Sequence, residues 1–204
     1  MIGIAIIVIS YLLGSIPTAY IVARIRQNAD IRRFGTGNAG AANVISHIGI
    51  WEGIIVGLVD IAKGAVCIYL GRLTGISQFW LLGAGFSVLL GHNFSFFIGF
   101  KGGKGAAVTV GIFLMLAPKE TGLILGIMLI LLLIIRNFAF AISLSLLFLP
   151  LTIWLFDRDM VLVIYSGIIL LFMGLRSLPF ISQARPWKSK NSSSRDKTDR
   201  HITL

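Results

Sequence analysis

The N-terminal stretch MIGIAIIVISYLLGSIPTAYIVARIR, residues 1–26, decides the fold class of this chain. Its apolar run at 2–22 has the length of about 20 residues that a helix needs to cross a bilayer. No positive charge precedes the run, whereas Arg24 and Arg26 follow it, which is the reverse of the order in a cleaved signal peptide. The stretch therefore predicts a first transmembrane helix with its N-terminus outside.

The composition of the whole chain also indicates a membrane protein. Of its 204 residues, 56% are hydrophobic and 13% are charged, whereas a soluble domain has about a quarter charged residues. The formal net charge of +10 would suggest a nucleic-acid partner for a soluble protein. In a membrane protein it reflects loops that face the cytoplasm, so no nucleic-acid partner is expected.

Apolar stretches along the chain predict an all-α integral membrane protein with about seven transmembrane helices. The fourth and fifth are too short to span alone, and PKETG between them is a turn signal. These two form either short tilted spans or a re-entrant helical hairpin. The stretches are 2–22, 53–70, 79–98, 106–117, 121–135, 138–156 and 160–175.

The distribution of cations predicts the orientation. With the N-terminus outside, the outer loops hold Arg72, Lys119 and Arg158, Lys63 lies within a span, and the other 14 of the 18 cations fall inside. This bias towards the cytoplasm predicts a cytoplasmic C-terminus. Residues 1–180 then form a single membrane-embedded domain, and the basic, serine-rich tail at 181–204 is predicted to be disordered in the cytoplasm.

The first glycine-rich segment on the inner side is RRFGTGNAGAANV, residues 32–44. Its glycines permit backbone conformations that other residues avoid, and its hydroxyl and amide side chains donate and accept hydrogen bonds. The pattern is typical either of a flexible loop or of a tightly folded loop held against other backbone or a ligand. The candidate binding residues are Thr36, Gly37, Asn38, Gly40 and Asn43.

The second such segment is FIGFKGGKGAAVTVGIF, residues 97–113. Glycine N–H groups, two lysines and the start of a helix near Gly105 together predict a phosphate cradle. The alternative is that the lysines only anchor a helix end to lipid headgroups. A nucleotide-binding P-loop would need glycine at 98 and a hydroxyl residue at 105, so ATP is not implied. The candidate residues are Lys101, Gly102, Gly103, Lys104 and Gly105.

Ionisable residues inside the predicted spans are a third signal. Asp60 and Lys63 lie three residues apart on one helix face. They are either functional, as intramembrane charges often are, or a structural ion pair. His92, near the inner end of the third span, is a candidate base, hydrogen-bond partner or helix cap. No second histidine or cysteine stands at metal-binding spacing, so no metal is expected, and no organic cofactor is implied.

Together these segments resemble the bacterial acyl-phosphate:glycerol-3-phosphate acyltransferase family. The resemblance runs from YLLGSIPTAYIVA to about Arg176, and its most specific parts are GTGNAGAANV, DIAKG and GHNFSFFIGFKGGKG. It implies a seven-span enzyme of the bacterial cytoplasmic membrane with its active site facing the cytoplasm. Such enzymes transfer a fatty acyl group from acyl phosphate to glycerol 3-phosphate and give lysophosphatidic acid, the first step of phospholipid synthesis.

The resemblance also implies a mechanism. The acyl chain lies in the hydrocarbon region, the mixed anhydride binds at Lys101–Gly105, and Arg176 is a substrate contact. The acceptor hydroxyl attacks the acyl carbon directly and phosphate leaves, so no covalent nucleophile is needed. Lys104 and His92 are the candidate catalytic residues, and the hydroxyl proton goes either to His92 or to the donor phosphate. Membrane lipids are the other expected partners, and the chain is a monomer or an oligomer of unknown size.

The chain departs from the family pattern mainly where the acceptor is expected to bind. Hydroxyl, polar or charged residues of the family are replaced, and each lost charged hydrogen bond removes about 1.5–3 kcal/mol. Two alternatives therefore stay open: a non-catalytic paralogue that binds acyl phosphate or lipid phosphate, and an acyltransferase with a different hydroxyl acceptor. The departures are Ala42, Ser46, Ala139, Leu175, Leu178 and Ile181.

Overall fold

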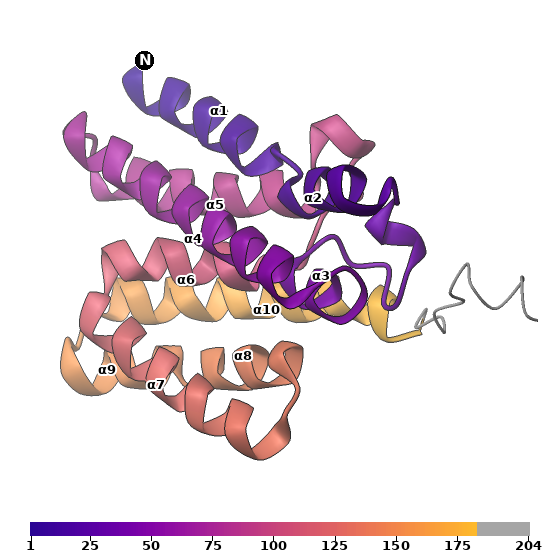
Figure 1. The fold of residues 1–204 in the computed structure, drawn as a ribbon. Helices are drawn as coiled ribbons and strands as arrows, with labels where there is room; N and C mark the ends of the chain where they lie inside the picture. Colours follow the sequence, from indigo (N-terminus) through magenta and orange to yellow (C-terminus); the bar gives the residue numbers. More distant parts are fainter. Residues whose placement is uncertain (183–204) are drawn as a thin grey trace, which may run out of the picture.

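The computed structural model describes residues 1–182, and the predicted disordered tail lies almost wholly outside the described residues. Within 1–182 all regular structure is helical, which confirms the all-α prediction (Figure 1). The helices are α1 (Ile2–Ser15), α2 (Thr18–Gln27), η1 (Ile31–Arg33), α3 (Ala41–His47), α4 (Ile50–Leu73), α5 (Gln78–Asn93), η2 (Phe96–Ile98), α6 (Ala106–Leu116), α7 (Pro118–Ile135), α8 (Phe138–Leu146), α9 (Leu149–Phe156) and α10 (Met160–Ser182).

Most of these helices form segments that are long and apolar enough to cross a membrane. The described residues contain 6 such segments and one shorter apolar helix, α6. Of the two stretches predicted to be short, α7 has 18 residues and reaches spanning length, whereas α6 has 11. The spanning segments are Ile2–Gln27, Ile50–Leu73, Gln78–Ile98, Pro118–Ile135, Phe138–Phe156 and Met160–Leu178.

The short helix α6 lies in the middle of the bundle. In Figure 1 it runs between α4 and α5 on one side and α7–α9 on the other. Its residues 108–113 are all buried, and a Cβ on Gly111 would overlap the backbone of α4, so the two helices touch closely. Its 11 residues cover only about 16 Å, roughly half of the hydrocarbon thickness. The glycine-rich loop at 99–105 therefore continues the chain beside other helices rather than in lipid.

The predicted first transmembrane segment is present at Ile2–Gln27, and its helix is interrupted in the middle. α1 ends at Ser15 and α2 begins at Thr18. Pro17 between them has no N–H and its ring excludes the preceding helical turn, so the helical ladder cannot run through it. The bend leaves backbone carbonyls near Ile16 without helical partners, and these become important for the site.

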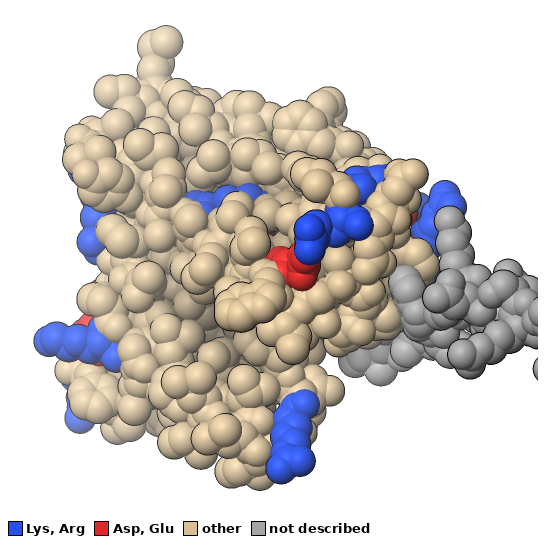
Figure 2. Space-filling model, viewed as in Figure 1, with Lys and Arg blue, Asp and Glu red and all other residues tan. Residues whose placement is uncertain are grey.

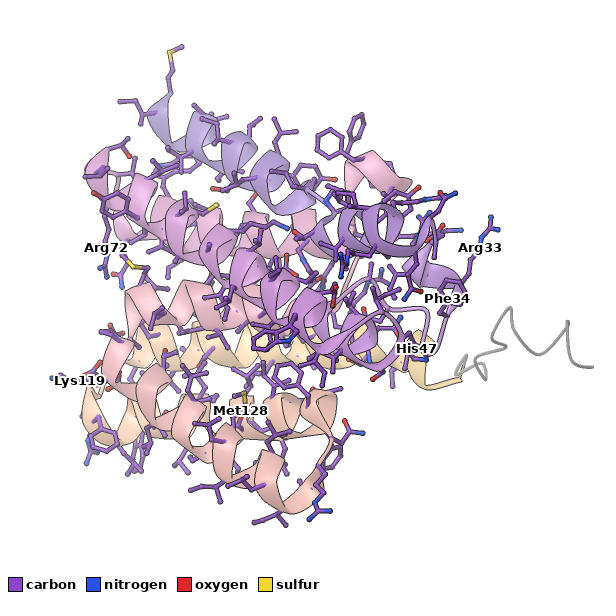
Figure 3. The ribbon with its side chains drawn as sticks, in the orientation of Figure 1. Arg33, Phe34, His47, Arg72, Lys119 and Met128 are labelled. Carbon is purple, nitrogen blue, oxygen red and sulfur yellow. The ribbon has the colours of Figure 1, made fainter. Side chains whose placement is uncertain are left out.

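Basic side chains lie at both ends of the bundle. Arg33, Phe34 and His47 lie at one end, and Arg72 and Lys119 lie at the opposite end (Figure 3). Most of the face shown in Figure 2 carries neither acidic nor basic side chains, as expected for a surface that faces lipid. A small second core, with Ala23, Ile31 and Val44 fully buried, packs the loop after α2 against this end of the bundle.

Candidate functional site

A buried charge cluster joins α4 to the bend in the first span. The Lys63 ammonium lies 2.7 Å from Asp60 Oδ1 and donates to the carbonyl of Ile16 at 2.6 Å. It also donates to the Thr18 hydroxyl, which in turn donates to Asp60 at 3.2 Å. Only 5% of the Lys63 side chain and 2% of the Asp60 side chain are exposed. The pair therefore closes the carbonyl end of α1, which supports the structural interpretation of these two residues.

His92 lies between this cluster and the second glycine-rich loop. It is in the last turn of α5, 8% exposed, with Nδ1 3.7 Å from Asp60 Oδ1. On its other side, a Cβ added to Gly103 would overlap the imidazole ring at Nε2. The carboxylate thus faces one ring nitrogen and the loop backbone faces the other, an arrangement that holds the ring in one orientation.

The loop at 101–105 folds back onto the end of α5. The N–H of Gly102 donates to the carbonyl of Asn93, and that of Gly103 donates to the carbonyl of His92, both at 3.1 Å. This corrects the expectation that the glycines leave their N–H groups unobstructed for phosphate. These glycines instead permit close packing, because a Cβ at either position would overlap α5 atoms.

The positive charge at this loop comes from the lysines and from the N-terminus of α6. Lys101 is exposed, whereas Lys104 is half-buried and its burial lowers the pKa of the ammonium group. Gly105 is the N-cap of α6 and has a φ of 93°, a left-handed conformation that favours glycine. No hydrogen bond is found within the described residues for the N–H groups of 106–108, as is usual for a first helical turn. An anion at this helix end would meet those N–H groups and the positive end of the helix dipole.

Two further side chains converge on the same point. Asn93 is fully buried beside Gly105, and its amide has no hydrogen-bond partner among the described residues. Arg176, from α10, donates to the carbonyl of Asn93 at 3.0 Å, and its guanidinium lies 4.8 Å from the centre of the Phe94 ring. Arg176, the predicted substrate contact near the C-terminus, is thus hydrogen-bonded to the end of α5.

The first glycine-rich loop is tightly folded around one side chain. The Asn43 amide donates to the carbonyls of Ile31, Phe34 and Asn38 at 3.2, 3.1 and 3.0 Å. Gly35 and Gly37 both have positive φ, 52° and 72°, in the turn that these bonds close. Of the two alternatives, the structure favours a loop held against its own backbone. The N–H groups of the Asn43 amide serve that purpose, whereas its Oδ1 is buried without a hydrogen-bond partner among the described residues.

The remaining residues predicted in this loop lie along its outer part. The Thr36 hydroxyl is exposed and accepts the N–H of Asn38 at 3.4 Å. The Asn38 side-chain oxygen is buried without a hydrogen-bond partner among the described residues, and Gly40 is the N-cap of α3. Among the described residues, no hydrogen bond joins Thr36 or Asn38 to His92 or Lys63.

The two glycine-rich loops lie side by side. Arg32 donates to the carbonyl of Ile98 at 2.6 Å, just before the second loop, and the carbonyl of Ala39 stands 2.9 Å from where a Cβ of Gly103 would be. Asp30 fixes Arg32 with hydrogen bonds of 2.8 and 2.9 Å. These hydrogen bonds lower the pKa of Asp30 and raise that of Arg32.

Sequence reasoning missed Thr18, Asn93 and Arg32 as parts of this arrangement. The sequence does contain a signal for the region around Thr18. A proline at 17 within a span leaves carbonyls without helical donors, and another donor, such as a buried cation, must then bind them. Asn93 belongs to no sequence motif that would mark it as a site residue. Among the described residues, no group of three His, Cys, Asp or Glu side chains is placed to hold a metal ion.

The positions that depart from the family pattern carry no charge towards this cluster. The Ser46 hydroxyl donates to the carbonyl of Ala42, within α3. Leu175 and Leu178 are 60% and 61% exposed on α10. Ala139 is exposed in the first turn of α8. The side chain of Ile181 lies outside the described residues.

A family model and individual relatives of the same description both match this chain. The family model described as glycerol-3-phosphate acyltransferase matches residues 4–182. A glycerol-3-phosphate acyltransferase 1 of Dehalococcoides mccartyi is 35% identical over 176 residues, covering 83% of this chain and 85% of that protein. A relative from Chlorobaculum tepidum, with the name glycerol-3-phosphate acyltransferase, is 39% identical over 138 residues, which span 62% of this chain and 60% of that protein.

Solved structures with the same fold are also known. The crystal structure of PlsY, an integral membrane glycerol 3-phosphate acyltransferase, in its glycerol 3-phosphate form has a TM-score of 0.82 with this chain. The match covers 94% of this chain and 98% of that one at 24% identity. A lysophosphatidic acid form gives a TM-score of 0.77 at 23% identity. The likeness confirms the fold of a multi-pass integral membrane protein.

Proposed function

Because this chain belongs to the glycerol-3-phosphate acyltransferase family, we propose that it transfers a fatty acyl group from an acyl phosphate to glycerol 3-phosphate, giving lysophosphatidic acid. One observation in the structure carries the proposal furthest. Lys104 and the start of α6 belong to a loop that packs on the end of α5, where His92 lies. That loop combines anion-binding groups with a candidate base beside the membrane interior.

The donor phosphate binds at the N-terminus of α6 in this proposal. The N–H groups of 106–108 and the Lys104 ammonium supply the donors, and Lys101 adds charge from the exposed side. Gly102 and Gly103 shape the loop rather than bind phosphate, because their N–H groups are already donated to α5. The positive groups stabilise the negative charge that develops as the acyl–phosphate bond breaks.

The acceptor hydroxyl attacks the acyl carbon, and its proton goes to His92 or to the departing phosphate. Asp60 favours a proton on Nδ1, the nitrogen that faces it at 3.7 Å, which leaves Nε2 as the basic nitrogen on the loop side. Nε2 is close to the backbone of Gly103. Proton transfer by His92 therefore needs a small shift of the loop when substrates bind, whereas transfer to phosphate needs none.

The proposed location is the bacterial cytoplasmic membrane, with the site at the cytoplasmic face. The end of the bundle that carries Arg33 and His47 is also the end at which both glycine-rich loops lie (Figure 3). The excess of cations at this end supports its placement in the cytoplasm.

The test is acyl transfer by purified protein in phospholipid nanodiscs. Palmitoyl phosphate and glycerol 3-phosphate are supplied, and both lysophosphatidic acid and inorganic phosphate are measured. Equal amounts of the two products, dependent on the acceptor, are expected. Hydrolysis of the donor without lysophosphatidic acid would contradict the proposal.

The exposed leucines on α10 favour a second candidate, a paralogue that binds acyl phosphate without transferring its acyl group. Leu175 and Leu178 offer no hydrogen bonds at positions where the family pattern has polar or charged residues. Saturable binding of palmitoyl phosphate with no product from glycerol 3-phosphate or from other small alcohols would support this candidate. Product from another alcohol alone would instead indicate a different acceptor.

A further inference from the structure

The end of the bundle opposite the two glycine-rich loops contains a buried carboxylate. Glu120 lies in the first turn of α7, beside the labelled Lys119 in Figure 3, and only 1% of its surface is exposed. Neither carboxylate oxygen has a hydrogen-bond partner among the described residues, and none of the ion pairs found there includes it. A buried charge without a partner is costly, so a group that these residues do not supply must neutralise it.

The surroundings of Glu120 explain its burial but offer it no donor. Ala117 and Ile124, one turn before and one turn after it, belong to the main hydrophobic core. The hydroxyl of Thr121, the next residue, already donates to the carbonyl of Ala117 at 2.8 Å. Lys119, the cation adjacent in sequence, is exposed and forms no ion pair with the carboxylate.

The usual partner of a glutamate at this place in a helix is already occupied. Glu120 is the third residue of α7, from which a carboxylate normally reaches back to the N–H of the N-cap residue. That residue is Ala117, whose N–H donates to the carbonyl of Phe113 at 2.7 Å. Pro118, the first residue of α7, has no N–H. The junction between α6 and α7 has therefore lost two donors that its oxygen atoms would otherwise use.

The same junction contains backbone carbonyls without donors. α6 ends at Leu116, and within the described part of the chain no hydrogen bond is found to the carbonyls of 114–116. Carbonyls in the last turn of a helix carry the negative end of its dipole. Because Glu120 follows the end of α6 by four residues, its carboxylate adds a full negative charge to this turn of the chain. The junction is thus rich in acceptors and poor in donors, which favours a cation.

We propose that this junction, formed by Glu120 and the carbonyl end of α6, binds a sodium ion. Carboxylate and carbonyl oxygens are the ligands of hard cations, and transition metals prefer nitrogen or sulfur. One carboxylate among neutral carbonyls balances the charge of a monovalent ion. In membrane transporters the C-terminal ends of half-length helices coordinate sodium in this way. The ion holds the end of α6 against the first turn of α7.

A proton on Glu120 is the competing explanation. A protonated carboxyl group donates one hydrogen bond and can satisfy one carbonyl. A cation contacts several oxygen atoms at once, so it accounts for the carbonyls of 114–116 as well as for the carboxylate. The inference does not depend on acyl transfer, because the junction lies at the opposite end of the bundle from the proposed phosphate site (Figure 3).

The test is thermal unfolding of the purified full-length protein in detergent. Sodium chloride is titrated against choline chloride at constant ionic strength, since choline is too large for an enclosed carboxylate. The wild type should gain stability with sodium until the effect saturates. At a sodium concentration a hundredfold above the dissociation constant, the midpoint should rise by roughly 5–10 °C.

Two variants locate the ion. Glu120→Gln keeps the shape of the side chain but removes its charge, and it should lose the dependence on sodium. Asp157→Asn is the matched control, because it removes an exposed carboxylate from the connection between α9 and α10. This control should keep the full dependence. Sodium stabilisation of wild-type size in Glu120→Gln would overturn the inference and place the ion elsewhere.

A binding measurement on the wild type does not depend on how the variants fold. Equilibrium dialysis with radiolabelled sodium should show a single saturable site, with the dissociation constant that the unfolding curves give. The absence of saturable binding would overturn the inference. Equal unfolding midpoints in sodium and in choline would also overturn it, and both results would indicate that Glu120 is neutralised by a proton.

Discussion

The two glycine-rich loops have similar compositions but are held in place by different means. The loop at 34–40 is organised by one side chain, since the Asn43 amide binds three of the carbonyls around it. The loop at 101–105 is organised by backbone, since its glycines let it lie directly on the end of α5. The first loop should therefore depend most on an asparagine, and the second on the absence of side chains at its glycines.

The largest effect is expected from Gly103→Val. A side chain at this position would overlap the His92 ring and the carbonyl of Ala39, which separates the two loops and displaces the candidate base. We expect acyl transfer to fall to background in the nanodisc assay. Gly126→Ala, in open space on α7, is the matched control and should keep normal activity. Near-normal transfer by Gly103→Val would show that the loop does not need to pack closely on His92.

Lys104→Met is the next test, and it probes the chemistry of the second loop. Removing a half-buried positive charge beside α6 should lower kcat/KM about a hundredfold, or nearly 3 kcal/mol, the usual size for one preorganised charge-stabilising group. Lys101→Met, at the exposed position, should lower it only a few-fold because water screens that charge. Equal losses in the two variants would argue against a special role for Lys104.

Asn43→Ala tests the first loop through stability. The substitution leaves three carbonyls without their donor, one of them buried with Ile31, and we expect a loss of about 2 kcal/mol in unfolding free energy. Ser46→Ala, which removes an exposed hydroxyl from the same helix, should change stability by less than about 0.5 kcal/mol. Thermal unfolding in detergent, with hydrogen exchange of residues 31–40, measures both. Unaltered exchange in Asn43→Ala would show that the glycines alone fold the loop.

The smallest effect concerns acid. The pKa of Asp30 is lowered by its hydrogen bonds to Arg32, so the folded chain holds a proton less readily than the unfolded chain. The contribution of Asp30 to folding stability is complete above a pH of about 4. It is lost as the pH falls through the lowered pKa of the folded chain. The pair is partly exposed, and the loss should stay below about 1 kcal/mol. In the wild type, acid should weaken the contact between Arg32 and Ile98, which hydrogen exchange of these residues would show. Asp30→Asn should remove this dependence on acid. The same acid dependence in Asp30→Asn would assign it to another group.

The sequence predicts much of the fold because membrane spans are long apolar runs that need no partner to be recognised. It also identifies both loops, since glycines next to lysines and asparagines are unusual between such runs. It does not predict how the loops are held. The roles of Asn43 and Lys63 depend on carbonyls 5 to 47 residues away, as the spacings of their hydrogen bonds show, and no periodicity relates such positions.

The sequence leaves the nature of the short α6 open. Its apolar stretch at 106–117 is too short to span, and both a tilted span and a hairpin fit it. The structure shows why it can be short: its surface is buried among other helices, and the loop that precedes it is covered by α5 and by the first loop. Burial of this kind depends on tertiary packing and leaves no signature in a hydropathy pattern.

The bend in the first span has a consequence for how the protein is made. The carbonyl of Ile16 and the hydroxyl of Thr18 leave the ribosome before Lys63 does, and both later bind its ammonium group. A second span arriving alone in lipid would carry that charge with only Asp60 beside it, a costly state. We therefore expect the first two spans to leave the insertion machinery as a pair, because the proline break in the first span supplies the hydrogen-bond acceptors for the lysine.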